Sequence, residues 1–146
     1  MASTPYPTND GVAVAGITTI PVNSALAGVQ GTSDLLTDYV VPFSFQVLGL
    51  RFAITTVAST ASKLSTHQIY VGPTASAVAV AGASIALTTA LVTPIGKIIL
   101  APATAQGNAA TIYPAGTKIQ LKNTAVTPFV EGAGTFFIDL RNCDES

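Results

Sequence analysis

Charged residues are scarce in this sequence. Asp, Glu, Lys and Arg together make up 9% of its 146 residues, the first basic residue is Arg51, and no charged residue occurs from Leu64 to Gly96. A soluble single domain usually carries about 25–35% of its surface as charged residues. Most of this surface must therefore be neutral, which favours a subunit that packs against other protein over a free cytosolic enzyme.

Basic clusters, a leader sequence and a disulfide framework are also missing. The net charge is -1 with 6 dispersed Lys and Arg residues, so nucleic-acid binding is not expected, because a phosphate backbone would find no basic stripe. Residues 1–30 contain no basic residue and are interrupted by prolines, which differs from a secretory signal peptide and indicates synthesis in the cytosol. The single cysteine, Cys143, excludes an intramolecular disulfide.

One uncharged stretch, Ala75–Val92, has the length of a membrane span. Most of its apolar residues are alanines, Ser, Thr and Gly interrupt it, and neither an aromatic belt nor a basic cluster flanks it. We therefore expect no membrane partner.

Residues that carry chemistry are equally sparse. His67 is the only histidine, which excludes a multi-histidine metal site within the chain, and a serine triad around it would lack the Gly-X-Ser-X-Gly elbow. We interpret His67 as lying at a loop edge beside a short strand, Gln68–Val71. A Cys143–His67 pair would place its nucleophile on a chain end, and no acidic residues have calcium-loop spacing. We predict no catalytic, cofactor or metal site and no enzymatic activity.

The sequence does contain a series of short β patterns. Its 9 prolines and 12 glycines are scattered along the chain and leave no room for long helices. Apolar residues alternate with other residues at Phe43–Val47, Leu50–Ile54, Lys118–Lys122 and Phe136–Leu140, which predicts strands with one dry face. Strands at spacings near ten residues predict an all-β, antiparallel β-sandwich or jelly-roll-like domain over residues 35–146.

Several segments leave alternatives open. Gly49 either separates two strands or bends one long strand. The runs on either side of Gly82 favour a hairpin, and the alanine content of residues 83–91 leaves a helix as the alternative. Ser33–Asp38 fits a short capped helical turn, and Gly132–Gly134 fits a hairpin turn before the last strand.

Residues 1–34 differ from the rest of the chain. They hold three prolines and isolated apolar residues without a regular period, and they are poor in charge, unlike a solvated tail. We interpret them as an extended arm that orders on a partner, in preference to a disordered tail or an ordinary first strand. The arm residues predicted to bind the partner are Ile17, Ile20, Val22 and Leu26. A further predicted interface anchor is Phe137, which shares a strand face with Asp139 and Arg141.

Three features of the sequence form one pattern: an apolar N-terminal segment, a neutral body with runs such as Tyr70–Pro73 and Ala83–Thr88, and the closing runs Ala115–Leu121 and Gly132–Phe137. This pattern resembles the capsid cement, or decoration, proteins of tailed bacteriophages. The resemblance implies an adhesive virion protein without a cofactor. It implies a homotrimer on the outer surface of the head at three-fold and quasi-three-fold positions, bridging capsomers of the major capsid protein after assembly in the host cytoplasm. Similar patterns occur in phage fibre and spike domains, so binding of a host-surface receptor or glycan is the alternative.

Overall fold

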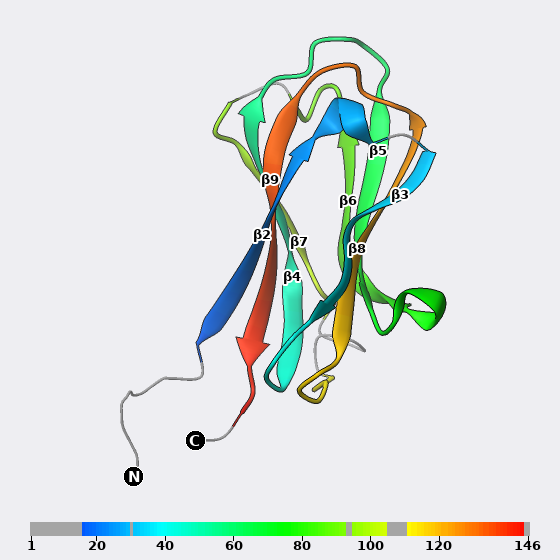
Figure 1. Ribbon diagram of the computed structural model, residues 1–146. Helices are drawn as coiled ribbons and strands as arrows, with labels where there is room; N and C mark the ends of the chain where they lie inside the picture. Colours follow the sequence, from blue (N-terminus) through cyan, green and yellow to red (C-terminus); the bar gives the residue numbers. More distant parts are fainter. Residues whose placement is uncertain (1–15, 30, 93–94, 105–110, 145–146) are drawn as a thin grey trace.

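The chain forms two stacked β-sheets in the computed structural model (Figure 1). The structure describes residues 16–29, 31–92, 95–104 and 111–144. The strands are β2 (Ile17–Ala25), β3 (Gly31–Val40), β4 (Phe45–Thr56), β5 (Leu64–Val71), β6 (Val78–Thr88), β7 (Ile98–Pro102), β8 (Lys118–Thr127) and β9 (Ala133–Asn142), with 3-10 turns η1 (Leu26–Gly28) and η2 (Thr74–Ser76). The predicted all-β antiparallel sandwich is confirmed. In the described part of the chain, no helix has the length and apolar character of a membrane span.

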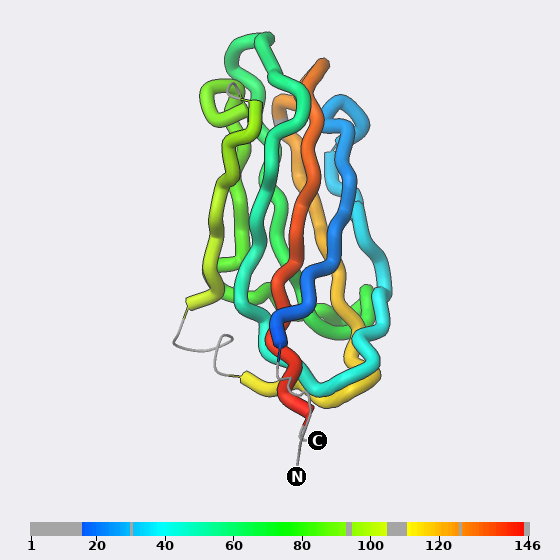
Figure 2. Tube along the Cα trace, turned by 90° about the vertical axis from the view of Figure 1, so that its left-hand side faces the viewer, coloured from blue at the N-terminus to red at the C-terminus, as the bar shows by residue number. Residues whose placement is uncertain are grey.

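Strand pairing follows a nested order. β2 pairs with β9, β3 with β8, β4 with β7 and β5 with β6, all antiparallel. The pairings β4–β9 and β5–β8 join these units into a first sheet, β2-β9-β4-β7, and a second sheet, β3-β8-β5-β6. The chain changes sheet between most consecutive strands, which is the arrangement of a jelly roll. Figure 2 looks onto the first sheet, with its four strands side by side.

The core lies between the two sheets and follows the alternation of the strands. Phe136, Ile138 and Leu140 of β9 are fully buried, as are Ile119 and Leu121 of β8. The dry faces predicted for these two strands are therefore confirmed. Each large apolar side chain stabilises the fold by about 1.5–3 kcal/mol when it is fully buried, so this layer holds the two sheets together.

A β-bulge at Leu48 explains why the alternation changes phase along β4. Consecutive residues of β9 pair with Val47 and Gly49, which leaves Leu48 as an extra residue. Val47 and Leu50 both face the core as a result, although their positions differ by three and would lie on opposite faces of a regular strand. One bent strand is thus the correct alternative. A Cβ atom at Gly49 would lie 2.7 Å from the carbonyl oxygen of Ala101, so glycine allows β7 to approach β4 here.

The predicted arm is corrected over its second half. Residues Ile17–Ala25 form β2, which pairs along its whole length with β9, and β3 begins at Gly31. Ile20 and Leu26 are buried in the chain's own core, because the apolar residues of this segment cover the edge of the sandwich. The sandwich therefore begins at β2 and not at residue 35. Residues 1–15 lie outside the described residues.

Three local predictions are also wrong. β6 runs continuously through Gly82, because both of its halves pair with β5 and not with each other. That pairing also excludes a helix at residues 83–91. Ser33–Asp38 lies in β3, where pairing with β8 replaces the capped turn. Gly134 lies in β9, and the chain before it crosses from the second sheet to the first, so Gly132–Gly134 is not a hairpin turn.

Candidate interaction surface

The outer face of the first sheet brings together side chains from all four of its strands. Two adjacent rows cross it, and each row takes one residue from β2, β9, β4 and β7. The first row is Pro21, Phe137, Arg51 and Leu100. The second row is Thr19, Asp139, Gly49 and Pro102. Phe137, Asp139 and Arg51 alternate with buried residues along β9 and β4, so these side chains face away from the core. Gly49 is itself buried, because the β7 backbone lies against it.

An ion pair joins the two rows. Arg51 donates from Nε to Oδ2 of Asp139 at 2.6 Å and from its terminal NH2 nitrogen to Oδ1 at 2.9 Å. Thr19 donates its hydroxyl to the same Oδ1 at 2.8 Å, and the Arg51 guanidinium lies 4.8 Å from the ring centroid of Phe137. Hydrogen bonding to the Asp139 carboxylate raises the pKa of Arg51 further. Both charges are thus neutralised within the face itself.

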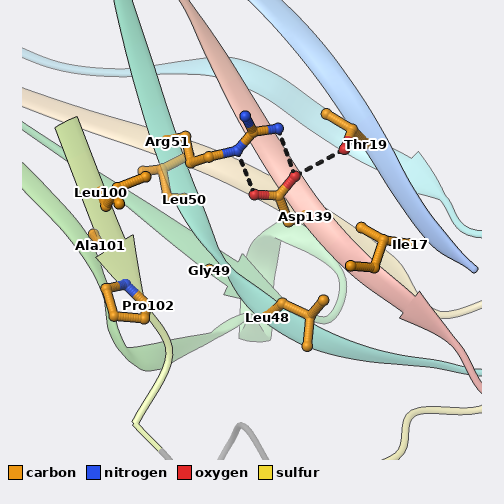
Figure 3. Close-up of a pocket in the computed structure, with 10 residues that line it drawn as sticks. All are labelled: Ile17, Thr19, Leu48, Gly49, Leu50, Arg51, Leu100, Ala101, Pro102 and Asp139. Carbon is orange, nitrogen blue, oxygen red and sulfur yellow. Dashed lines mark hydrogen bonds and ion pairs between the residues drawn. The ribbon is translucent and has the colours of Figure 1, made fainter. Parts of the chain in front are cut away.

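A hollow of about 450 Å³ opens beside this ion pair (Figure 3). Gly49 is part of its lining, where the backbone of β7 occupies the position that a side chain would take. The apolar residues that line the hollow are Ile17, Leu48, Leu50, Leu100, Ala101 and Pro102. Thr19, Arg51 and Asp139 complete the lining. The hollow therefore suits an apolar group much better than a charged one.

Large aliphatic side chains stand exposed around the hollow. Leu100 is 67% exposed, Ile17 66% and Ile98 51%. Together with Phe137 and Arg51 they form an apolar surface with one aromatic ring and one arginine at its centre, a composition enriched at the buried centres of protein interfaces. We call this set of residues the docking face. The charge of Arg51 is paired with that of Asp139, and the exposed Arg141 lies at the edge of the face, opposite Ile17.

His67 lies inside the sandwich and not at a loop edge, which corrects the sequence prediction. It occupies β5, is fully buried, and stacks on Phe136 with ring centroids 4.4 Å apart. Its Nε2 contacts the Ser65 hydroxyl at 2.8 Å and its Nδ1 contacts Oδ1 of Asn123 at 2.6 Å. Burial lowers the pKa of His67 to about 4. A Ser-His-Asn set of this kind has triad composition, but no substrate reaches it here.

The other polar clusters tie loops to strands. Gln120 is fully buried, although it alternates with the core residues Ile119 and Leu121 of β8. Its amide nitrogen donates to Asp38 Oδ1 at 2.8 Å and to the Gly72 carbonyl at 2.7 Å. These bonds, with those from Thr74, lower the pKa of Asp38. Among the described residues, no three His, Cys, Asp or Glu side chains group as metal ligands would.

The structure divides the predicted partner-binding residues. Ile17 and Phe137 lie on the docking face, whereas Ile20 and Leu26 are buried and Val22 packs against the core. Sequence reasoning missed the Arg51–Asp139 pair, because the partners are 88 positions apart and meet only through the β4–β9 register. The sequence did carry one local signal: the alternation of apolar residues changes phase at Gly49, as expected where a single strand bends.

Comparisons with known proteins leave the family open. No protein-family model matches the chain, and no curated protein matches it. Among solved structures, one from the Gx strain of infectious bursal disease virus is 17% identical with a TM-score of 0.27, covering 88% of this chain and 37% of that chain. The VP2 subviral particle of the same virus is 12% identical with a TM-score of 0.26, covering 89% and 41%. At such TM-scores the likeness carries no argument about function.

Proposed function

We propose that this protein is a structural subunit of a viral particle, a homotrimeric cement protein on the outer surface of a phage head. In this role it sits at three-fold and quasi-three-fold positions and bridges neighbouring capsomers of the major capsid protein. The observation that carries the proposal is the docking face, on which Ile17, Ile98 and Leu100 are exposed around an internally neutralised ion pair. Jelly rolls also occur in capsid proteins, which is an argument from fold analogy only.

The physical argument concerns the cost of desolvation. A surface that buries free charges must compensate for the loss of their hydration. On the docking face, Arg51 and Asp139 already bind each other, and 9% of the whole chain is charged. Packing this face against another protein therefore removes apolar area from water at little electrostatic cost. Several modest contacts per trimer would together hold the subunit on a shell, because linked sites bind as one multivalent unit.

The test measures mass and shell binding on the same preparation. Light scattering should give a mass near three times 14.8 kDa, and the protein should cosediment with undecorated phage heads. Ile98→Asp places a charge on the docking face, whereas Val40→Asp makes the same type of change in β3 of the second sheet; both residues are 51% exposed. We expect Ile98→Asp to reduce shell binding and Val40→Asp to leave it unchanged. A monomeric protein that does not bind shells would disprove the proposal.

A further inference from the structure

The hollow on the docking face requires an apolar occupant. Its walls are aliphatic apart from Thr19, Arg51 and Asp139, and the two charged groups are bound to each other. An occupant with a charge would lose hydration without gaining a partner. The hollow also opens on a sheet face and not between the sheets, so a chain segment can reach it without any opening of the sandwich.

The N-terminal sequence supplies a segment of this chemistry. Residues 11–15 read Gly-Val-Ala-Val-Ala and carry no charge. They directly precede Ile17, which itself lines the hollow. Fifteen residues in extended form reach up to about 50 Å, which is enough to extend from one sandwich onto the next. Length and composition thus agree with the hollow.

We propose that the hollow binds the apolar segment Gly11–Ala15 of a neighbouring copy of the same chain. Val12 or Val14 enters the hollow and packs on its aliphatic lining beside the Arg51–Asp139 pair. The contact is heterologous, since a segment of one copy meets a face of the next. Such contacts form a ring, here of three copies, when the rotation between copies closes. This inference rests on the self-association in the proposed function and adds the identity of the two contacting surfaces.

The direction of β2 favours a neighbouring copy over the chain's own segment. Gly16 accepts a hydrogen bond from the Asn142 amide at 3.0 Å, at the end of the sheet where β2 begins. β2 then runs from Ile17 towards the row of Thr19 and Gly49, so the described chain enters the sheet from the side that faces away from this row. To reach the hollow over β4, the chain's own segment would have to reverse and cross two strand spacings, about 10 Å. A neighbouring segment needs no reversal.

The first experiment uses a peptide of residues 1–15 with a fluorescent label and a variant that lacks residues 2–15. That variant retains the whole described sandwich. We expect saturable binding of the peptide in fluorescence anisotropy, weakened by at least about tenfold when Leu100→Asp is added, because the new charge lies in an apolar site. Val78→Asp is the matched control, since Val78 in β6 of the second sheet is 66% exposed and Leu100 is 67% exposed. A peptide that fails to bind, or that binds equally to the Leu100→Asp variant, overturns the inference.

The second experiment decides which copy supplies the segment. In a Cys143→Ser background, Val12→Cys and Leu100→Cys are combined in the full chain and oxidised. We expect the double cysteine variant to form disulfide-linked oligomers larger than dimers on a denaturing gel. Each single cysteine variant should form no species larger than a dimer. A cross-link confined to the monomer would show that the chain's own segment fills the hollow and would overturn the inference.

The failure of this inference is distinguishable from the failure of the proposed function. If the variant without residues 2–15 remains trimeric and does not bind the peptide, the inference is overturned while the trimer stands. If the full-length protein is a monomer that ignores phage heads, the proposed function is disproved directly by the light-scattering and cosedimentation measurements.

Discussion

Two polar clusters of three side chains lie on opposite sides of one sheet layer of this sandwich. Ser65, His67 and Asn123 lie in the core, with exposures of 1%, 0% and 1%, and their histidine is neutral at ordinary pH because burial lowers its pKa to about 4. Thr19, Arg51 and Asp139 lie on the outer face of the first sheet and form a charged, hydrogen-bonded set. The inner cluster has the composition of a catalytic triad, yet only the outer cluster is accessible to a partner.

The comparison shows that accessibility decides what a polar cluster can do. The inner cluster contributes to the folded state, because its ring nitrogens and the oxygens that contact them satisfy one another in the core. The outer cluster contributes little to stability, as exposed ion pairs usually do, but it removes the electrostatic cost of covering its face. We therefore expect changes in the inner cluster to act on unfolding and changes in the outer cluster to act on assembly.

The largest expected effect is the acid sensitivity of the inner cluster. The pKa of His67 is about 4 in the folded protein, whereas an exposed histidine, as in the unfolded chain, has a pKa of 6.5. The unfolded chain therefore binds the proton more tightly. The resulting stability is fully present above pH 6.5 and is lost as the pH falls towards 4. The difference corresponds to about 3 kcal/mol. Denaturant unfolding from pH 7.5 to 4 measures it.

A matched variant isolates the histidine from the carboxylates. His67→Gln removes the titration and keeps a polar side chain in the cluster. The pKa values of Asp38 and Glu131 are lowered by hydrogen bonds, so their contributions are lost only when the pH falls below their usual range, under about 4.5. The wild-type and His67→Gln curves should therefore separate between pH 6.5 and 4.5. Parallel curves in that window would mean that His67 does not remain neutral in the core.

A smaller effect on stability is expected at the outer cluster. Asp139→Asn keeps the shape of the side chain but leaves Arg51 as an unpaired charge on the docking face. The free energy of unfolding should fall by less than about 1 kcal/mol, whereas trimer formation and shell binding should fall strongly, because the guanidinium must now be desolvated alone. Denaturant unfolding and light scattering on the same samples measure the two quantities.

The double variant Arg51→Met with Asp139→Leu tests the cause of that loss. It removes both charges of the pair and leaves neither one unpaired, so assembly should recover relative to Asp139→Asn. If Asp139→Asn assembles as the wild type does, or if the double variant assembles no better than the single one, neutralisation by the ion pair is not what permits docking.

The sequence predicted the parts of the fold that depend on local alternation. The dry faces of β8 and β9 follow from residues two positions apart, such as Ile119 with Leu121. His67 has the same parity as Ile69 and Val71 in β5, so its burial was within reach of the same rule. The prediction failed because a lone polar histidine was assigned to a loop edge. To place His67 on the buried face of β5, one must know that Asn123 of β8 supplies a partner for its ring.

The candidate site depended on non-local pairing and was only partly predictable. Ile17 and Phe137, predicted from composition and strand face, lie on the outer face of the first sheet, whereas Ile20 and Leu26 are buried because β2 pairs with β9. No local pattern in residues 17–25 indicates that they pair with β9, which lies more than 100 positions away in the sequence. The hollow follows from the bulge at Leu48 and the approach of β7 to Gly49, and both arise from the register between strands.

The smallest expected effect on stability comes from Phe137, and it separates anchoring from packing. Phe137→Leu removes the ring that faces the Arg51 guanidinium at 4.8 Å, an interaction worth about 0.5–1 kcal/mol at an exposed site. Tyr70→Leu removes a similar contact in the second sheet, where Lys122 Nζ lies 5.0 Å from the ring centroid. The two variants should lose similar, small amounts of unfolding free energy, but only Phe137→Leu should weaken trimer formation and shell binding, since aromatic residues at the centre of an interface contribute strongly to binding. If both variants weakened trimer formation and shell binding equally, the docking face would not be the surface through which this sandwich assembles.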